Sequence, residues 1–204
     1  MVYTDSEYLR GKDAKFATQF TKWVHKKFFK APGKIIDVGC GKGLYLCEFK
    51  KLNYQTCGVD VDEDAVKLAR KNGVKVFKCN LERGRLPFRN DFFDYAFVRY
   101  VTPCVKNTRN FLKEIRRVLK PNGLFLMIEL DWNRSRKTYY NGPYKIKKRF
   151  GLELLRKTLV SYNFKIVKAR KFQNIPYIWR YTTRAFDFVS PNHKSIVIVS
   201  KKTV

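Results

Sequence analysis

The chain has 204 residues, enough for one domain with a sizeable core. Apolar residues make up 45% of it and aromatic residues 16%, which argues against a disordered chain. Lysine and arginine total 44 against 17 acidic residues, so the formal net charge is +27. No apolar run is long enough for a membrane-spanning helix, and the first residues lack the apolar stretch of a signal peptide.

The cysteines are scattered and odd in number. None forms a C-x-x-C pair, and the chain has only 2 histidines, so we expect no structural metal site. We expect reduced thiols and a cytoplasmic location. The five are Cys40, Cys47, Cys57, Cys79 and Cys104.

The positive charge is distributed unevenly. Residues 1–131 hold 26 basic and 15 acidic side chains, a net of +11, whereas residues 132–204 hold 18 basic and 2 acidic, a net of +16. The smaller segment therefore carries the larger excess. This asymmetry suggests contact with a polyanion such as RNA, DNA or an anionic membrane surface, and a compositional bias without function stays the alternative.

The periodicity of apolar residues predicts helices that alternate with strands. Phe16, Phe20 and Val24, for example, share one helical face, and Asp62 is a plausible N-cap. The expected helices cover 14–29, 44–52, 63–71, 107–119 and 151–162, and the expected strands 34–38, 55–61, 74–79, 94–100, 124–130, 164–171 and 195–200. A turn is expected at 121–123.

This alternation favours a doubly wound α/β fold, with a parallel sheet covered by helices on both faces. Ligands of such folds bind at the carboxyl ends of the strands. Five segments should therefore form the ligand-binding edge: 37–43, 60–62, 80–82, 94–105 and 129–134.

The turn after the first strand is rich in glycine. Gly39, Gly41 and Gly43 follow Asp37 at alternate positions, between a buried strand and a helix. Without Cβ atoms the backbone can approach a ligand closely, and the helix N-terminus adds oriented N–H groups. Asp60 ends the next strand, where a carboxylate can accept both hydroxyls of a ribose. Together these features indicate a nucleoside-binding site.

This turn resembles D-x-G-x-G-x-G, the first motif of the class I (Rossmann-like) S-adenosylmethionine-dependent methyltransferases, and the chain looks like the methyltransferase type 11 family. Gly58-Val59-Asp60-Val61-Asp62, Asn80-Leu81-Glu82, Leu86-Pro87-Phe88 and Leu119-Lys120-Pro121-Asn122-Gly123 also match the family pattern, over roughly residues 33–130. The resemblance implies a seven-stranded Rossmann-like sheet whose last strand is antiparallel, with helices on both faces. It implies one domain over 1–204, with a helical lid (1–32), a cofactor-binding core (33–131) and a basic, aromatic substrate side (132–204).

The resemblance also implies the cofactor, S-adenosyl-L-methionine, and the residues around it. Asp37 would lie near its methionine end, Asp60 would take the ribose hydroxyls, and Arg99 would line the pocket. Asn80 stands where the family often has an aspartate that accepts from the adenine amino group, and its carbonyl oxygen can still accept. The full expected set is Asp37, Gly39, Cys40, Gly41, Gly43, Asp60, Val61, Asn80, Leu81 and Arg99.

The catalytic residues are not evident from the sequence. Methyl transfer from a sulfonium is an in-line displacement that needs alignment, and a base helps only where the acceptor must lose a proton. The weak candidates for a base are Glu129, Asp131 and Tyr100, and no metal is expected. Glu129 and Asp131 share one strand face. A capping or salt-bridging role for them, and plain loop structure at Arg99 and Tyr100, are the alternatives.

Residues 134–149 suggest an RNA acceptor. Cations can follow a phosphate backbone, and the three tyrosines of this segment can stack on unpaired bases. The segment has no acidic residue, and its basic ones are Arg134, Arg136, Lys137, Lys145, Lys147, Lys148 and Arg149.

Two other functions stay open. Residues 172–189 could wall an apolar pocket for a small hydrophobic or lipid-like acceptor, because they carry Phe172, Tyr177, Trp179, Tyr181, Phe186 and Phe188. The protein could instead be a non-catalytic, methyltransferase-like nucleic-acid-binding module, although the intact glycine turn argues against this. A protein acceptor is neither selected nor excluded, and the sequence does not indicate the oligomeric state.

Overall fold

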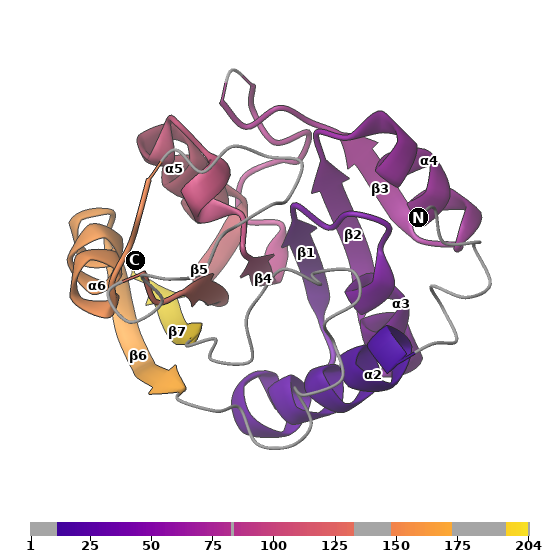
Figure 1. Cartoon of the computed structure of the whole chain (residues 1–204), viewed down its shortest axis with the longest axis horizontal. Coiled ribbons are helices and arrows are strands. Elements are labelled where there is room, and N and C mark those ends of the chain that lie inside the picture. Colours follow the sequence, from indigo (N-terminus) through magenta and orange to yellow (C-terminus); the bar gives the residue numbers. More distant parts are fainter. Residues whose placement is uncertain (1–11, 83, 133–147, 173–194, 204) are drawn as a thin grey trace.

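Short apolar strands alternate with amphipathic helices in the computed structural model, which describes residues 12–82, 84–132, 148–172 and 195–203 (Figure 1). The helices are α2 (Lys12–Val24), α3 (Leu44–Lys51), α4 (Glu63–Lys71), α5 (Thr108–Val118) and α6 (Leu152–Ser161), with a π-helical turn η1 (His25–Phe29) and a short 3-10 turn η2 (Thr102–Cys104). The strands are β1 (Lys34–Val38), β2 (Gln55–Asp60), β3 (Lys75–Lys78), β4 (Phe93–Arg99), β5 (Leu119–Leu130), β6 (Phe164–Phe172) and β7 (Ser195–Lys202).

The strands form one seven-stranded sheet in the order β3-β2-β1-β4-β5-β7-β6. β7 is antiparallel to both β5 and β6, and the pairs from β3 to β5 are parallel. The predicted doubly wound sheet with an antiparallel last strand is therefore confirmed. Because β1 pairs with β2 on one side and β4 on the other, the chain direction across the sheet reverses there, which is where such folds bind ligands.

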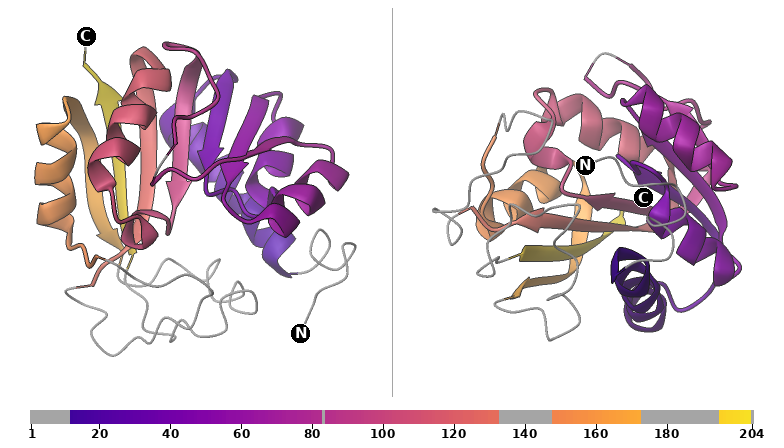
Figure 2. Two further views of the ribbon diagram at one scale, coloured as in Figure 1. Left: turned by 90° about the horizontal axis from the view of Figure 1, so that it is seen from above. Right: turned by 45° about the vertical axis from the view of Figure 1, so that its right-hand side comes forward.

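Helices cover both faces of the sheet, as the two views of Figure 2 show. On one face, α2 and α3 pack around Phe97, whose ring lies 5.8 Å from that of Phe20 and 6.1 Å from that of Phe49. On the other, α5 and α6 bury Phe111 and Leu159 against the sheet. α4 packs against β3 in a smaller cluster that also includes Cys40 and Leu46 of α3.

The first helix differs from its prediction as one helix over 14–29. α2 begins at Lys12 and ends at Val24, and η1 follows it. The N–H of Lys30, a residue with a φ of 63°, donates to the carbonyl of His25, which closes a wider π-helical turn. The described part of the expected lid, α2 with η1, packs on the sheet, and its role as a lid stays a prediction.

The strand predicted at 124–130 is longer, since β5 begins at Leu119. Buried Leu119 pairs with Phe93, and the register shifts before the next pair, Tyr95 with Leu124. The ammonium of Lys120 lies 2.7 Å from the carboxylate of Asp94 across this irregularity. The expected turn at 121–123 therefore lies within the bounds of β5, as an irregularity of the strand at which Asn122 has a φ of 66°.

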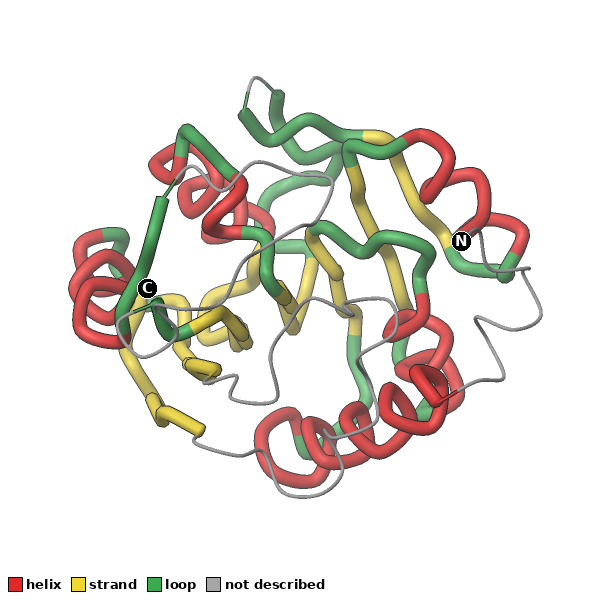
Figure 3. The backbone as a smooth tube through the Cα atoms, viewed as in Figure 1, coloured by secondary structure: helices red, strands yellow, loops and turns green. Residues whose placement is uncertain are grey.

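The parallel strands β1, β2, β3 and β4 have their carboxyl ends at the same edge of the sheet, and the loops that follow them carry most of the predicted site (Figure 3). Among the described residues, no helix is both long and apolar enough to cross a membrane.

Candidate functional site

The carboxyl ends of β1, β2 and β4 lie side by side. Asp37 of β1 is in register with Gly58 of β2 and with Phe97 of β4. Most of the residues that the sequence singles out for the cofactor therefore stand on, or directly after, neighbouring strand ends.

The glycine turn is hydrogen-bonded to the end of β2. The N–H groups of Gly39 and Cys40 both donate to the carbonyl of Val59, at 2.8 and 3.1 Å. The N–H of Gly41 donates to Oδ2 of Asp60 at 2.7 Å. The turn after β1 and the carboxylate after β2 thus form one rigid unit.

Two of the glycines in this turn are needed for different reasons. Gly39 has a φ of 80°, and a Cβ there would lie 2.3 Å from the Val101 side chain, so only glycine lets the loop after β4 approach. Gly41 has a φ of 51°, and nothing lies within 4 Å of the position of its Cβ. The backbone at Gly41 is therefore open on that side, and a side chain would fill this space.

The carboxylate of Asp60 is held in place by hydrogen bonds and can still accept further ones. Besides the bond from Gly41, its Oδ1 accepts the N–H of Asp62 at 3.0 Å. Each carboxylate oxygen can accept a further donor. Val61 follows with 45% of its surface exposed, so an apolar side chain borders this carboxylate.

Asp37 is buried, and its environment opposes ionisation. Burial raises the pKa of its carboxyl well above the ordinary value, the nearby Asp60 raises it further, and Arg99 lowers it. The Arg99 guanidinium lies among aromatic rings. Its carbon is 4.7 Å from the centre of the Tyr100 ring and 5.1 Å from the centre of the Tyr45 ring. A cation near Asp37 would favour its charged form.

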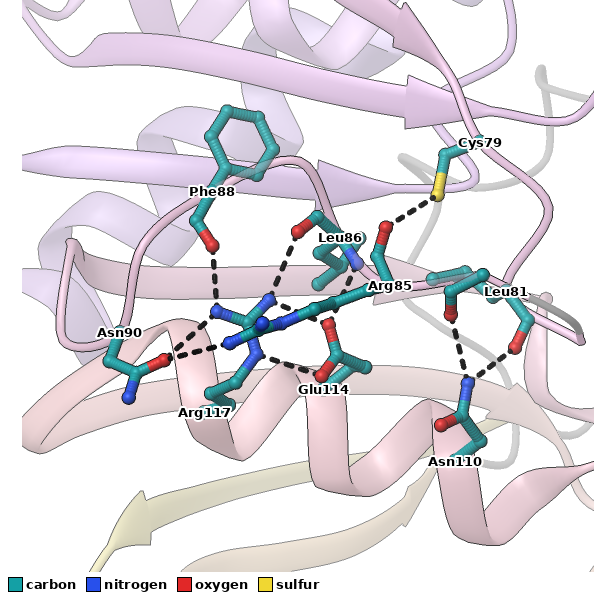
Figure 4. Close-up of polar contacts among 10 residues, drawn as sticks. Cys79, Leu81, Arg85, Leu86, Phe88, Asn90, Asn110, Glu114 and Arg117 are labelled. Carbon is teal, nitrogen blue, oxygen red and sulfur yellow. Dashed lines mark hydrogen bonds and ion pairs between the residues drawn. The ribbon is translucent and has the colours of Figure 1, made fainter.

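The loop after β3 carries Asn80 and Leu81 and is tied to α5 (Figure 4). The Asn110 side chain donates to the carbonyls of Leu81 and Gly84, both at 3.0 Å. Asn80 is exposed, and its Oδ1 accepts the N–H of Glu82, so this side chain shapes its own loop and keeps one acceptor site.

An ion pair on α5, between the buried Glu114 and the half-buried Arg117, holds the rest of this loop. Glu114 and Arg117 lie 2.6 Å apart, and Glu114 accepts the N–H of Leu86 at 2.7 Å. Arg117 donates to the carbonyls of Leu86 and Phe88 (Figure 4). Sequence reasoning missed both residues. Their spacing of three on a helix was visible, but the loop that they bind is far away in the sequence.

The side chain of Cys40 packs beneath the glycine turn. It is buried beside Leu46, and burial raises the pKa of its thiol, as do Asp37 and Asp60. A Cβ at Gly58 would lie 2.7 Å from its sulfur, so β2 needs glycine where Cys40 packs.

Of the three candidates for a base, Glu129 and Asp131 are buried, and Tyr100 is hydrogen-bonded. Glu129 is completely buried and accepts the N–H of Thr102 at 2.9 Å, so it braces the loop after β4. The hydroxyl of Tyr100 lies 3.1 Å from that of Ser195, and the Tyr100 backbone has a φ of 59°. A catalytic role for these residues stays a prediction.

Asp131 is also completely buried, on the same sheet face as Glu129. Lys171 lies 3.8 Å away, and neither oxygen of Asp131 has a hydrogen-bond partner within the part of the chain that the structure describes. This face carries α5 and α6, opposite the face that carries α2 and α3.

Only two residues of the predicted RNA-binding set lie within the described residues. Lys148 donates to the Thr108 hydroxyl at 3.0 Å, at the start of α5, and the Arg149 guanidinium lies 5.5 Å from the Trp132 ring. Arg134, Arg136, Lys137, Lys145 and Lys147 lie outside the described residues, as do the aromatic residues of 173–189.

Replacing Glu129 by glutamine tests its burial. Burial raises the pKa of Glu129 to about 8, so the folded state keeps a proton that the unfolded state releases above its ordinary value of 4.5. The contribution of Glu129 to wild-type stability therefore falls as pH rises from 4.5 to about 8. Glutamine does not ionise, so the variant should not lose stability in this way, and its side-chain oxygen can still accept the N–H of Thr102. Urea unfolding at both ends of this range should show the variant gaining on wild type by on the order of a few kcal/mol. A constant difference would contradict a buried, proton-bearing Glu129.

Comparison with known proteins agrees with this geometry. A methyltransferase domain model matches residues 36–127. An uncharacterised protein of Methanocaldococcus jannaschii is 27% identical over 66% of this chain and 67% of its own length. The sterol 4-C-methyltransferase of Caenorhabditis elegans is 24% identical over 59% of this chain but only 39% of its own. The chain thus spans from about two fifths to two thirds of these curated relatives.

The fold is also found among solved structures. A SAM-dependent methyltransferase from Archaeoglobus fulgidus superimposes with a TM-score of 0.75 and 18% identity, over 97% of each chain. The methyltransferase domain model thus covers a little under half of the chain, and the chain shares the fold of the Archaeoglobus fulgidus methyltransferase.

Proposed function

We propose that this protein transfers a methyl group from S-adenosylmethionine to an acceptor at the carboxyl edge of the sheet. The observation that carries this proposal is the unit formed by the glycine turn and Asp60. The backbone at Gly41 is open, Asp60 keeps two acceptor sites for a ribose, and exposed Val61 offers an apolar surface to an adenine ring. These residues fit the cofactor of the family.

Asp37 and Arg99 would lie at the methionine end of the cofactor. The cofactor supplies a methyl group on a positively charged sulfur, and its leaving group is a neutral thioether that needs no acid. This chain therefore has to bind and align the reactants. Asn80 and Leu81, held to α5 through Asn110, would border the adenine.

The acceptor that we favour is RNA. Support comes from the net charge of +27 and from the excess of cations after residue 131. The exposed side chains of Lys148 and Arg149 lie by the first turn of α5, near the carboxyl ends of β4 and β5. Their charges would attract a phosphate backbone to this edge of the sheet.

A small apolar acceptor is the second candidate. One relative is a sterol methyltransferase, and residues 172–189 carry six aromatic rings. Such a substrate needs an apolar pocket with few polar groups.

Purification without nuclease, followed by incubation with labelled S-adenosylmethionine, distinguishes these acceptors. We expect RNA to copurify and to take up the label, with binding that weakens steeply as salt rises. Cofactor binding with label in the lipid fraction instead would favour the apolar acceptor. Failure to bind the cofactor would contradict the proposed function and favour a nucleic-acid-binding module without catalysis.

A second prediction uses the raised pKa of Asp37. The positive charge of the cofactor favours the ionised carboxylate, so binding below this pKa must release a proton. The Kd for S-adenosylmethionine should therefore fall as pH rises above 3.8, the ordinary pKa of an aspartate, for as long as the cofactor's own amino group stays protonated. Calorimetry should show this dependence in wild type and its loss in Asp37→Asn. The same pH dependence in both proteins would contradict a position of Asp37 beside the cofactor.

A further inference from the structure

A cavity of about 490 Å³ opens between α5 and the turn that joins α6 to β6. It belongs to the face opposite α2 and α3, and it shares no residue with the predicted cofactor set. Its lining consists of Arg109, Lys113 and Arg116 from α5, Ser161 from the end of α6, and Tyr162 and Asn163 from the turn.

The three cations of the cavity form one stripe on α5. Their spacing of four and then three residues puts them on one helical face, where like charges destabilise the helix slightly. None of them has a carboxylate within 4.0 Å in the part of the chain that the structure describes, and no acidic residue lines the cavity. Arg117, by contrast, is paired with Glu114. An unneutralised row of this kind favours an anionic ligand.

The cations have an ordered arrangement. Arg116 donates from Nη2 to the carbonyl of Thr203 at 3.1 Å, which fixes its guanidinium at one end of the row. Arg116 lies seven positions after Arg109 on the helix, a rise of about 10 Å. The row is therefore long enough for an extended anion with several negative groups.

The remaining lining residues identify the kind of anion. Tyr162 contributes a half-buried aromatic ring beside the cations, a combination that suits phosphates and a stacked base. None of the six lining residues is aliphatic, whereas a membrane-inserting surface needs apolar side chains.

We propose that this cavity, together with the row Arg109, Lys113 and Arg116, binds the phosphate backbone of a nucleic acid. The start of α5 lies at the carboxyl end of β4, because the chain reaches it directly after that strand. Lys148 contacts Thr108 there, so the positive row continues to the edge that carries the predicted cofactor site. The cavity would thus bind a part of the RNA that lies outside the catalytic site. This inference rests on the proposed function, in which RNA is the methyl acceptor.

A double variant tests the proposal. Arg109→Ala with Lys113→Ala removes two exposed cations four residues apart on α5. The control, Lys67→Ala with Lys71→Ala, removes two exposed cations with the same spacing on α4, near the other edge of the sheet. The probe is a fluorescein-labelled single-stranded RNA, and anisotropy gives its Kd between about 50 and 200 mM salt.

The slope of log K against log salt should fall by about 1.4 in the α5 variant, because each single-strand phosphate contact contributes about 0.7. The α4 variant should keep the wild-type slope. An equal fall in both variants, or in neither, would overturn the proposal, because it would mean that binding follows overall charge. So would an α5 variant that loses binding to phosphatidylserine vesicles but not to RNA.

Calorimetry with S-adenosylmethionine separates this inference from the proposed function. Both double variants should bind the cofactor as wild type does, since neither removes a predicted cofactor residue. RNA binding through α5 in a protein that does not bind the cofactor would support the cavity and contradict methyl transfer.

Discussion

The hydrogen bond from the Gly41 N–H to Asp60 is the constraint on which the rest of the site depends. It joins the turn after β1 to the end of β2, and it requires a left-handed backbone in the turn. Gly39 then lets Val101 approach, so the loop after β4 is placed by the same turn. Three strand ends at the reversal of chain direction are thereby held in one arrangement. A site built on such a unit is formed before a ligand arrives, which lowers the entropy cost of binding.

The buried carboxylates divide between the two sheet faces. Asp37 lies with Arg99 on the face covered by α2 and α3, whereas Glu129 and Asp131 lie beneath α5 and α6. Glu129 accepts the N–H of Thr102, and this hydrogen bond explains why Glu129 is buried without requiring a catalytic role. The basic cavity opens on the side of α5 and α6 as well. Cofactor binding would thus use the carboxyl edge of the sheet, and the proposed contact with nucleic acid would use the face that carries α5 and α6.

The fold and the position of the glycine turn could be predicted because their signals are local. Alternating periodicity gave the order of elements, and Asp62 does cap α4 through the N–H groups of Asp64 and Ala65. The π-helical turn at His25–Phe29 depends on a left-handed Lys30, which no propensity indicates. The irregularity in β5 depends on cross-strand pairing, and the Glu114–Arg117 pair acts on a loop about 30 residues away in the sequence. The cavity beside α5 likewise needs the packing of α6, so its cations look like an ordinary solvated face in the sequence.

Calorimetric titration with S-adenosylmethionine tests the central claim, that Asp60 and the glycine turn form the cofactor site. Asp60→Asn keeps an acceptor for Gly41 but loses the charge, and we expect its affinity to fall about tenfold or more, since hydrogen bonds to charged groups contribute about 1.5–3 kcal/mol. Asp62→Asn should stay within about twofold of wild type, because asparagine caps a helix as well as aspartate. Equal affinities for wild type and Asp60→Asn, or an equal loss in both variants, would contradict the account.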